Sequence, residues 1–279
     1  MSPVTTIELI KLALREDMPD GDVTTESLAV RPRQGECILR AKNDLVLSGS
    51  SAFEQTMTFL EPHAKLKWLF SDGDVVFKNQ TICSIEGDLI QILKAERVAL
   101  NFLGRLSGIA TLTREYAKAV SGTKTQILDT RKTTPLLREL EKKAVVHGGG
   151  QNHRFNLSDA ILVKDNHISL IGGISKAVER IRQNSNLKIE VEASSLEQVK
   201  LCVELKVDRI LLDNMPNEVL AEALKLIPKE IKTEASGNMN LARVRSVAEL
   251  GVDFISVGAL THSAPTADVS LLFDWNINL

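Results

Sequence analysis

Basic side chains gather in one short stretch of this sequence, which runs from Leu128 to Arg154. Arg131 and Lys132 directly follow an apolar run, while His153 and Arg154 follow three consecutive glycines. Guanidinium groups bind anionic oxygens through paired hydrogen bonds, and glycines let a ligand approach the backbone closely. The stretch is therefore either an anion-binding site or a solvated helix that ends at a glycine stop.

One further lysine and two carboxylates lie at the ends of other apolar runs. Lys164 ends "DAILVK", Glu192 lies in "LKIEVEAS", and Asp213 ends "RILLD". Glu190 and Glu192 are two residues apart, so in a strand they face the same side. Carboxylates so placed suit sugar hydroxyls or Mg²⁺, which prefers one or two carboxylates together with substrate phosphates. The simpler alternative is a helix cap or a surface carboxylate.

Two glycine-containing turns follow the last two apolar runs. Ser236 and Gly237 lie in "ASGNMN", and Gly258 lies in "SVGALTHS". Backbone N–H groups in loops after the last strands of α/β barrels form a recurring phosphate site. The alternative is a pair of ordinary strand-to-helix turns. Together with the basic stretch, these turns favour a substrate that carries several negative charges.

A strand-helix unit that repeats after Thr123 would bring these residues together. Strand-helix alternation predicts a parallel sheet. Six apolar strands are expected, and a seventh if "KKAVVHGG" (142–149) is extended; they are residues 125–130, 159–166, 187–194, 207–214, 231–237 and 252–259. No GxGxxG motif follows the first strand. Polar residues end every strand, and only a barrel brings all strand ends to one mouth, so an incomplete α/β barrel is expected.

The first third of the chain has a different pattern. Short strand-like runs broken at Asn43-Asp44 and Asp72-Gly73 predict a small sheet-rich α+β domain. A helical pattern of about thirty residues then leads out of it, and Thr5 with Glu8 has the spacing of a helix capping box. The expected domains are residues 1–110 and 111–279, with the C-terminal tail packing back on the first domain.

Composition excludes several classes of protein. The chain has 279 residues and a formal net charge of −2, which argues against a nucleic-acid-binding surface. Its three cysteines and five histidines show no metal-binding spacing, and unpaired cysteines suit a reducing compartment. No segment has the apolar length of a membrane span or the unbroken apolar core of a secretory signal. A cytoplasmic protein without membrane or nucleic-acid partners is expected.

An ordered set of motifs resembles the quinolinate phosphoribosyltransferase family, also called nicotinate-nucleotide pyrophosphorylase (carboxylating). The matching segments span nearly the whole chain: "DGDVTTE", "ERVALNFLGRLSGIAT", "DTRKTTP", "GGGQNHR", "DAILVKDNHI", "RILLDN", "EASG" and "ISVGALTHSAP". The resemblance implies an N-terminal open sandwich followed by an incomplete α/β barrel. It also implies transfer of phosphoribosyl from phosphoribosyl pyrophosphate to quinolinate with Mg²⁺, which releases CO₂ and pyrophosphate and forms nicotinate mononucleotide for NAD synthesis.

The resemblance also implies residue roles. Quinolinate, a dicarboxylate, would contact Arg131, His153, Arg154 and Lys164, and Arg97 would reach it from a neighbouring subunit, which implies a homodimer with shared active sites. Phosphoribosyl pyrophosphate would contact Lys132, Glu192, Asp213, Ser236, Gly237 and Gly258. Glu192 and Asp213 are the implied Mg²⁺ ligands, and Lys132, Lys164, Glu192 and Asp213 the implied catalytic group. From its position alone, Arg97 would be an exposed helix residue.

Three residues depart from the family pattern, because Asn79, Leu136 and Asn238 stand where glycine is usual. Asparagine adopts left-handed backbone more readily than other non-glycine residues. Pro135 is expected to begin a helix, in which Leu136 would be tolerated. Two alternatives are a same-fold paralogue for another anionic substrate, such as the molybdenum-locus relative, and a non-catalytic nucleotide-binding relative. The second would lack some of the charged mouth residues, and none is missing here.

Overall fold

The structure is a computed structural model that describes residues 4–29 and 31–274. Its contacts divide the chain into two compact units. The first is made of Met1–Arg114, Thr133–Gly149 and Ser263–Leu279, and the second of Glu115–Lys132 and Gly150–His262. The division expected from the sequence was a single boundary at residue 110. That expected boundary assigned residues 133–149 to the barrel domain, and the C-terminal tail was expected to pack on the first domain.

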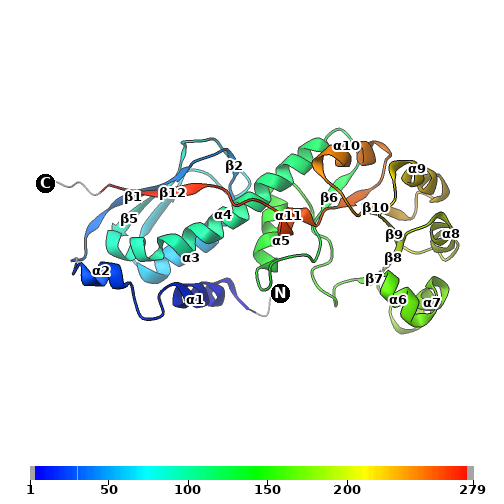
Figure 1. Cartoon of the computed structure of the whole chain (residues 1–279), viewed down its shortest axis with the longest axis horizontal. Coiled ribbons are helices and arrows are strands. Elements are labelled where there is room, and N and C mark those ends of the chain that lie inside the picture. The colour runs from blue at the N-terminus through cyan, green and yellow to red at the C-terminus, as the bar shows by residue number, and fades with distance from the viewer. Residues whose placement is uncertain (1–3, 30, 275–279) are drawn as a thin grey trace. The chain divides into compact units, whose positions relative to one another are not determined.

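The first unit contains a four-stranded antiparallel sheet (Figure 1). Its order is β12-β1-β5-β3, formed by Val269–Asp274, Gln34–Ala41, Thr81–Asp88 and Lys65–Trp68. Along β1 every second side chain is buried, namely Cys37, Leu39 and Ala41. This period of two places one face of the strand against the core. A separate antiparallel pair joins β2 (Leu45–Val46) to β4 (Val75–Val76).

Helices complete the first unit: α1 (Thr6–Asp17), α2 (Val23–Ser27), α3 (Ser50–Leu60), α4 (Leu89–Ala119) and α5 (Arg138–His147). The predicted capping box begins α1 and is confirmed, since Glu8 accepts a hydrogen bond from the Thr5 backbone and donates one to the Thr5 hydroxyl. Helices α3 and α4 pack on the sheet, because their buried residues, such as Phe53 and Leu103, share one apolar cluster with β1 and β5. The result is an open sandwich.

The second unit contains a six-stranded parallel sheet in which helices follow the strands. Its strands are β6 (Gln126–Leu128), β7 (Ile161–Val163), β8 (Ile189–Ala193), β9 (Arg209–Asp213), β10 (Lys232–Ser236) and β11 (Phe254–Ser256). The helices are α6 (Asp165–Ile171), α7 (Ile174–Asn184), α8 (Leu196–Glu204), α9 (Asn217–Leu226), α10 (Leu241–Glu249) and α11 (Ala259–His262). Helices α7, α8 and α9 stand in a row beside the strands (Figure 1).

The strand order identifies this sheet as a barrel with one gap. The order is β6-β11-β10-β9-β8-β7, so consecutive strands pair and the last strand, β11, returns to pair with the first, β6. Strands β6 and β7 form the two edges, and an isolated bridge between Leu128 and Gln151 lies beside β6. The predicted α/β class is confirmed, with six strands in the described residues. The segment considered as a seventh strand, 142–149, is mainly the end of helix α5.

The start of α5 differs from the expectation. Pro135 and Leu136 lie in a turn, and the helix begins at Arg138. Leu136 has a φ of +66°, in the left-handed region that costs a residue with a Cβ roughly 1–2 kcal/mol. The turn is held by Glu141, whose buried carboxylate accepts hydrogen bonds from the backbone and hydroxyl of Thr134. The hydrogen bonds between Thr134 and Glu141 therefore impose the left-handed backbone at Leu136.

Among the helices of residues 4–29 and 31–274, none combines the length and apolar character needed to cross a membrane. The longest helix of that set, α4, is interrupted along its length by charged residues such as Lys94, Arg97 and Arg105.

Candidate active site

One cavity of about 780 Å³ lies at the carboxyl ends of the parallel strands, entirely within the second unit. Ten of the eleven residues singled out from the sequence line it: Arg131, Lys132, His153, Arg154, Lys164, Glu192, Asp213, Ser236, Gly237 and Gly258. Parallel strands placed in barrel order bring their ends to one mouth, which explains how residues more than a hundred positions apart meet. Arg97 does not line it; this residue is exposed on α4 in the first unit.

A basic side of the cavity is built from the loops around β6 and β7. Arg131 and Lys132 lie in the loop that follows β6, and Arg154 is fixed by a hydrogen bond from its Nη1 to the carbonyl of Ala160 at 3.0 Å. Burial and the neighbouring charge of Arg131 lower the pKa of Arg154. Two guanidinium groups that repel one another here make a site that an anion with two acidic groups would relieve.

An acidic side of the cavity comes from β8 and β9. Burial raises the pKa of Glu192, the charge of Lys164 opposes that rise, and the charge of Asp213 adds to it. Lys164 is exposed, and its Nζ lies 3.7 Å from Glu192. Asp213 accepts a hydrogen bond from Asn214 at 2.7 Å. A divalent cation would relieve the repulsion between Glu192 and Asp213.

The turns after β10 and β11 approach other groups too closely for side chains. A Cβ on Gly237 would lie 2.1 Å from the Asn214 amide oxygen, and Gly237 has a φ of +87°. A Cβ on Gly258 would meet Lys132 and His262 at 3.1 Å. Asn238 has a φ of +52°, so asparagine does adopt the left-handed backbone at this position. These tight turns bring backbone N–H groups to the cavity wall, as an anion site requires.

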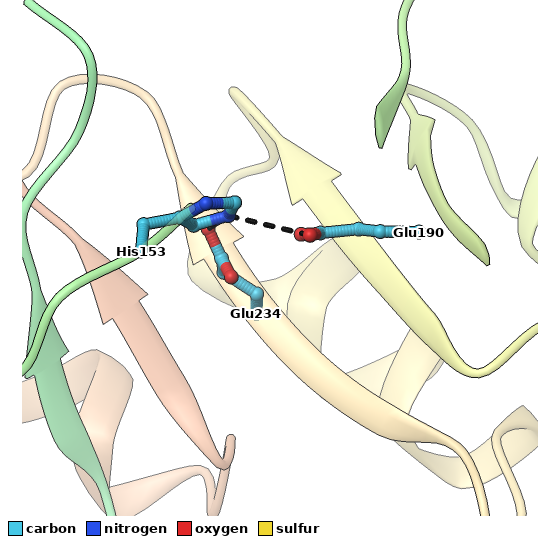
Figure 2. A group of neighbouring side chains, drawn as sticks. All are labelled: His153, Glu190 and Glu234. Atoms are coloured by element: carbon cyan, nitrogen blue, oxygen red, sulfur yellow. Dashed lines mark ion pairs between the residues drawn. The ribbon is translucent and has the colours of Figure 1, made fainter. Parts of the chain in front are cut away.

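At the base of the cavity lies a group of buried charged residues, of which only His153 was expected in the site. His153 Nε2 lies 3.3 Å from Glu190 and 3.5 Å from Glu234 (Figure 2). Burial would lower the pKa of His153, but hydrogen bonds and charges from these two glutamates outweigh it and raise the pKa to about 9. Glu234 was not singled out, although it precedes Ser236 by two residues just as Glu190 precedes Glu192.

Comparison with known proteins agrees with this geometry. The family model for the N-terminal domain of quinolinate phosphoribosyl transferase matches residues 22–107, and that for its C-terminal domain matches residues 109–272. This chain belongs to the quinolinate phosphoribosyltransferase family. The resemblance found from the motifs is therefore confirmed.

Relatives of the family are similar over most of their length. A probable nicotinate-nucleotide pyrophosphorylase (carboxylating) from Synechocystis is 43% identical, over 92% of this chain and 89% of its own length. A Bacillus subtilis relative of the same name is 39% identical, with the same two coverages. The crystal structure of nicotinate-nucleotide pyrophosphorylase from Ehrlichia chaffeensis superposes with a TM-score of 0.93 at 39% identity, over 98% of this chain and all of the other. Fold and family therefore agree along the whole chain.

Proposed function

We propose that this cavity binds quinolinate and phosphoribosyl pyrophosphate together and joins them. The reaction is the one for which the family is named: phosphoribosyl transfer to quinolinate with decarboxylation, which gives nicotinate mononucleotide, pyrophosphate and CO₂ in NAD biosynthesis. The observation that carries the proposal is the gathering of both signs of charge in one cavity, where Arg131 and Arg154 come from the loops next to β6 and β7 and Glu192 and Asp213 from β8 and β9. A dicarboxylate fits the first pair, and a sugar phosphate with its cation fits the second.

Quinolinate would lie on the basic side. Arg131, Arg154 and Lys164 supply cationic groups, and His153 supplies a buried imidazole at the base of the cavity. Forked guanidinium groups bind carboxylates with two parallel hydrogen bonds. The two acidic groups of quinolinate would therefore neutralise the repulsion that lowers the pKa of Arg154.

Phosphoribosyl pyrophosphate would lie across the opposite side. Its ribose hydroxyls would face Glu192 and Asp213, and its 5′-phosphate the tight turns at Ser236, Gly237 and Gly258. Lys132 lies next to Gly258, where its ammonium group can stabilise the departing pyrophosphate. All three phosphates then have donors or cations within the same cavity.

The residues present also fit Mg²⁺. Glu192 and Asp213 would hold it, since the pKa of Glu192 is raised partly by the unscreened charge of Asp213. When bound, Mg²⁺ supplies positive charge to the pyrophosphate oxygens. These two carboxylates, acting with substrate phosphates, are the arrangement Mg²⁺ prefers in proteins.

The chemistry requires positioning and charge stabilisation, without a covalent intermediate on the protein. The pyridine nitrogen forms a bond to ribose C1 as the bond from C1 to pyrophosphate breaks. The bond from the ring to the adjacent carboxylate then breaks, its electron pair stays on the ring carbon beside the cationic nitrogen, and a solvent proton replaces the CO₂. Lys132 stabilises the leaving pyrophosphate and Arg131 with Arg154 fixes the ring.

Arg97 is assigned to the neighbouring subunit of a homodimer. The support is its exposed position on α4, its absence from the lining of its own chain's cavity, and its place in the family motif "ERVALNFLGRLSGIAT". An exposed arginine on a rigid helix can complete a partner's site without folding into its own. Each dimer would then hold two composite sites for quinolinate.

We infer that the enzyme acts in the cytoplasm. Cys37, Cys83 and Cys202 are all unpaired, and burial raises the pKa of each thiol to about 12, which keeps them protonated and unreactive. Three unpaired cysteines suit a reducing compartment. Relatives named for the chloroplast in Arabidopsis and the mitochondrion in tobacco show that the compartment differs among organisms.

The reaction is tested by supplying quinolinate that carries ¹⁴C in the carboxylate next to the ring nitrogen. With phosphoribosyl pyrophosphate and Mg²⁺, the protein should release labelled CO₂ and form one nicotinate mononucleotide for each CO₂. Omission of phosphoribosyl pyrophosphate should prevent CO₂ release, since decarboxylation follows formation of the cationic ring. Absence of turnover, or mononucleotide that retains the label, would reject the proposed reaction.

A further inference from the structure

Two buried glutamates lie beneath the substrate cavity without an assigned role. Glu190 of β8 is 7% exposed and Glu234 of β10 is fully buried, and Arg209 comes from the strand between them. A buried carboxylate is costly unless it is paired and hydrogen-bonded. Both of these carboxylates contact His153, which lines the cavity. The free-energy cost of burying these two carboxylates is therefore offset in part by their contacts with the His153 imidazole.

The contacts around His153 fix which ring nitrogen keeps its hydrogen when the imidazole is neutral, above the raised pKa of about 9. Nδ1 accepts a hydrogen bond from the backbone N–H of Arg154 at 2.7 Å. Nε2 faces the carboxylates of Glu190 and Glu234, which can only accept (Figure 2). The amide opposes a proton on Nδ1, and the carboxylates stabilise one on Nε2. A hydrogen bond at each ring nitrogen sets both the tautomer and the plane of an imidazole.

The two glutamates are held to very different degrees. Arg209 Nη1 donates to Glu234 Oε2 at 3.0 Å, and the Ser256 hydroxyl donates to Glu234 Oε1. The guanidinium of Arg209 also lies over the Phe254 ring, 4.4 Å from its centre, which restricts its movement. Residues of the two neighbouring strands, β9 and β11, therefore hold Glu234 in place independently of its contact with His153.

Glu190 has fewer partners. Its Oε2 contacts His153 and lies 3.9 Å from Arg209, beyond hydrogen-bond distance. Its Oε1 has no hydrogen-bond partner among the residues that the structure describes. Glu190 also lines a second cavity, of about 440 Å³, whereas Glu234 lines the substrate cavity. Because Glu190 has fewer partners and does not line the substrate cavity, its loss should disturb that cavity less.

We propose that Glu234 is a positioning residue for the pyridine acid: it holds the His153 imidazole in one orientation, with hydrogen on Nε2, at the base of the cavity. Arg209 and Ser256 hold Glu234 in turn. Glu190 supports the same proton from the other side but does not set the ring's position. The inference rests on the proposed function only for the identity of the acid as quinolinate.

Two isosteric variants test this difference in role, because Glu234→Gln and Glu190→Gln each remove one charge from the same imidazole. In Glu234→Gln the amide can turn its NH₂ toward Nε2 and reverse the tautomer. The KM for quinolinate should rise by roughly 10- to 100-fold, the range seen when partners that orient a binding imidazole are removed. The KM for phosphoribosyl pyrophosphate should stay the same. Glu190→Gln should raise the KM for quinolinate much less than Glu234→Gln does, because fewer groups hold Glu190 in place.

A double-mutant cycle separates positioning from general damage to the fold. In a His153→Gln background, Glu234→Gln should have almost no further effect on the KM for quinolinate, because there is no imidazole left to orient. If the full effect of Glu234→Gln persists without His153, or if Glu190→Gln is the more damaging change, the proposal is wrong. Glu234→Asp should recover part of the lost affinity, since it restores the charge.

A spectroscopic measurement tests the same point without any substrate. The chain has five histidines, so in ¹⁵N-histidine-labelled protein the His153→Gln variant identifies the signal of His153. At a pH above 9, where the imidazole is neutral, hydrogen on Nε2 is expected in the unaltered protein, with a clear shift of both ring nitrogens in Glu234→Gln. Unchanged His153 signals in Glu234→Gln would overturn the proposal. Absence of quinolinate turnover by the unaltered protein would instead reject the proposed function. The ¹⁵N measurement would still show whether Glu234 orients His153.

Discussion

At the scale of single residues, burial and the neighbouring guanidinium of Arg131 together lower the pKa of Arg154. Such an arrangement is unfavourable in the empty cavity and favourable once an anion lies between the two groups. The same holds in reverse for Glu192 and Asp213. Fixed charges of this kind can stabilise an opposite charge without reorganisation, which is the kind of contribution that is often largest in catalysis.

The first prediction concerns individual cations of the cavity. Arg154→Ala and Lys132→Ala should each reduce kcat/KM by about two orders of magnitude, because each removes one charge-assisted contact with a substrate. Lys143→Ala is the matched control: Lys143 belongs to the same basic stretch but is exposed on α5, where it pairs with Glu139 at 2.9 Å. Steady-state rates for the three variants are the measurement. Near-normal rates for Arg154→Ala or Lys132→Ala would remove that residue from the site.

The second prediction concerns pH and the buried imidazole. The pKa of His153 rises from 6.5 to about 9 on folding, so its contribution to stability is fully present below pH 6.5 and is lost as the pH rises through 9. That contribution is at most about 3 kcal/mol. Denaturant unfolding of the unaltered protein and of His153→Gln at a series of pH values should show a stability difference that shrinks between pH 6.5 and 9. A difference independent of pH would contradict the raised pKa.

At the scale of elements, the strand ends were predictable from the sequence because each is a short apolar run followed by a polar residue. Lys164, Asp213 and Ser236 all lie at or directly after such runs, and the structure places them around one cavity. The barrel topology then gathers these residues, because it brings every carboxyl end of a strand to one face. Local patterns therefore sufficed for the residues of the mouth.

Other features depend on tertiary contacts that no local pattern reveals. The start of α5 was placed at Pro135, but Glu141 binds Thr134 and delays the helix to Arg138. Glu234 escaped attention because a glutamate inside a strand is ordinarily read as a solvent-facing residue, and its buried partners lie on other strands.

The third prediction concerns the turn before α5. Leu136→Gly should raise the free energy of unfolding by about 0.5–1 kcal/mol, because relief of the left-handed strain exceeds the greater unfolded-state entropy of glycine. Leu136 is half exposed, so little apolar burial is lost. Leu136→Ala keeps the Cβ and is the control, for which no gain is expected. Equal denaturation midpoints for the two variants would show that the turn is not strained.

At the scale of the whole molecule, the assignment of Arg97 to the neighbouring subunit predicts that active sites are shared between subunits. Arg97→Ala and Lys164→Ala chains should each be inactive alone and recover about a quarter of normal activity when mixed, since half of the dimers are mixed and each has one complete site. Lys164→Ala mixed with Glu192→Ala should recover nothing, because both residues line one chain's cavity. Subunit exchange is verified by native mass spectrometry. Exchange without recovery of activity in the Arg97 mixture would reject shared sites.

The choice between quinolinate and nicotinate is the most direct test of the proposed quinolinate site. The basic side of the cavity presents Arg131, Arg154 and Lys164 around His153, more donors than a single carboxylate needs. A monocarboxylate would leave desolvated cations unpaired, and sites built for a polar group reject analogues that lack it by roughly 10⁴ or more. The measurement is kcat/KM for quinolinate and for nicotinate with phosphoribosyl pyrophosphate and Mg²⁺, following nicotinate mononucleotide by chromatography. A preference for quinolinate of about 10⁴ is predicted; equal values for the two acids, or product from nicotinate alone, would contradict the account.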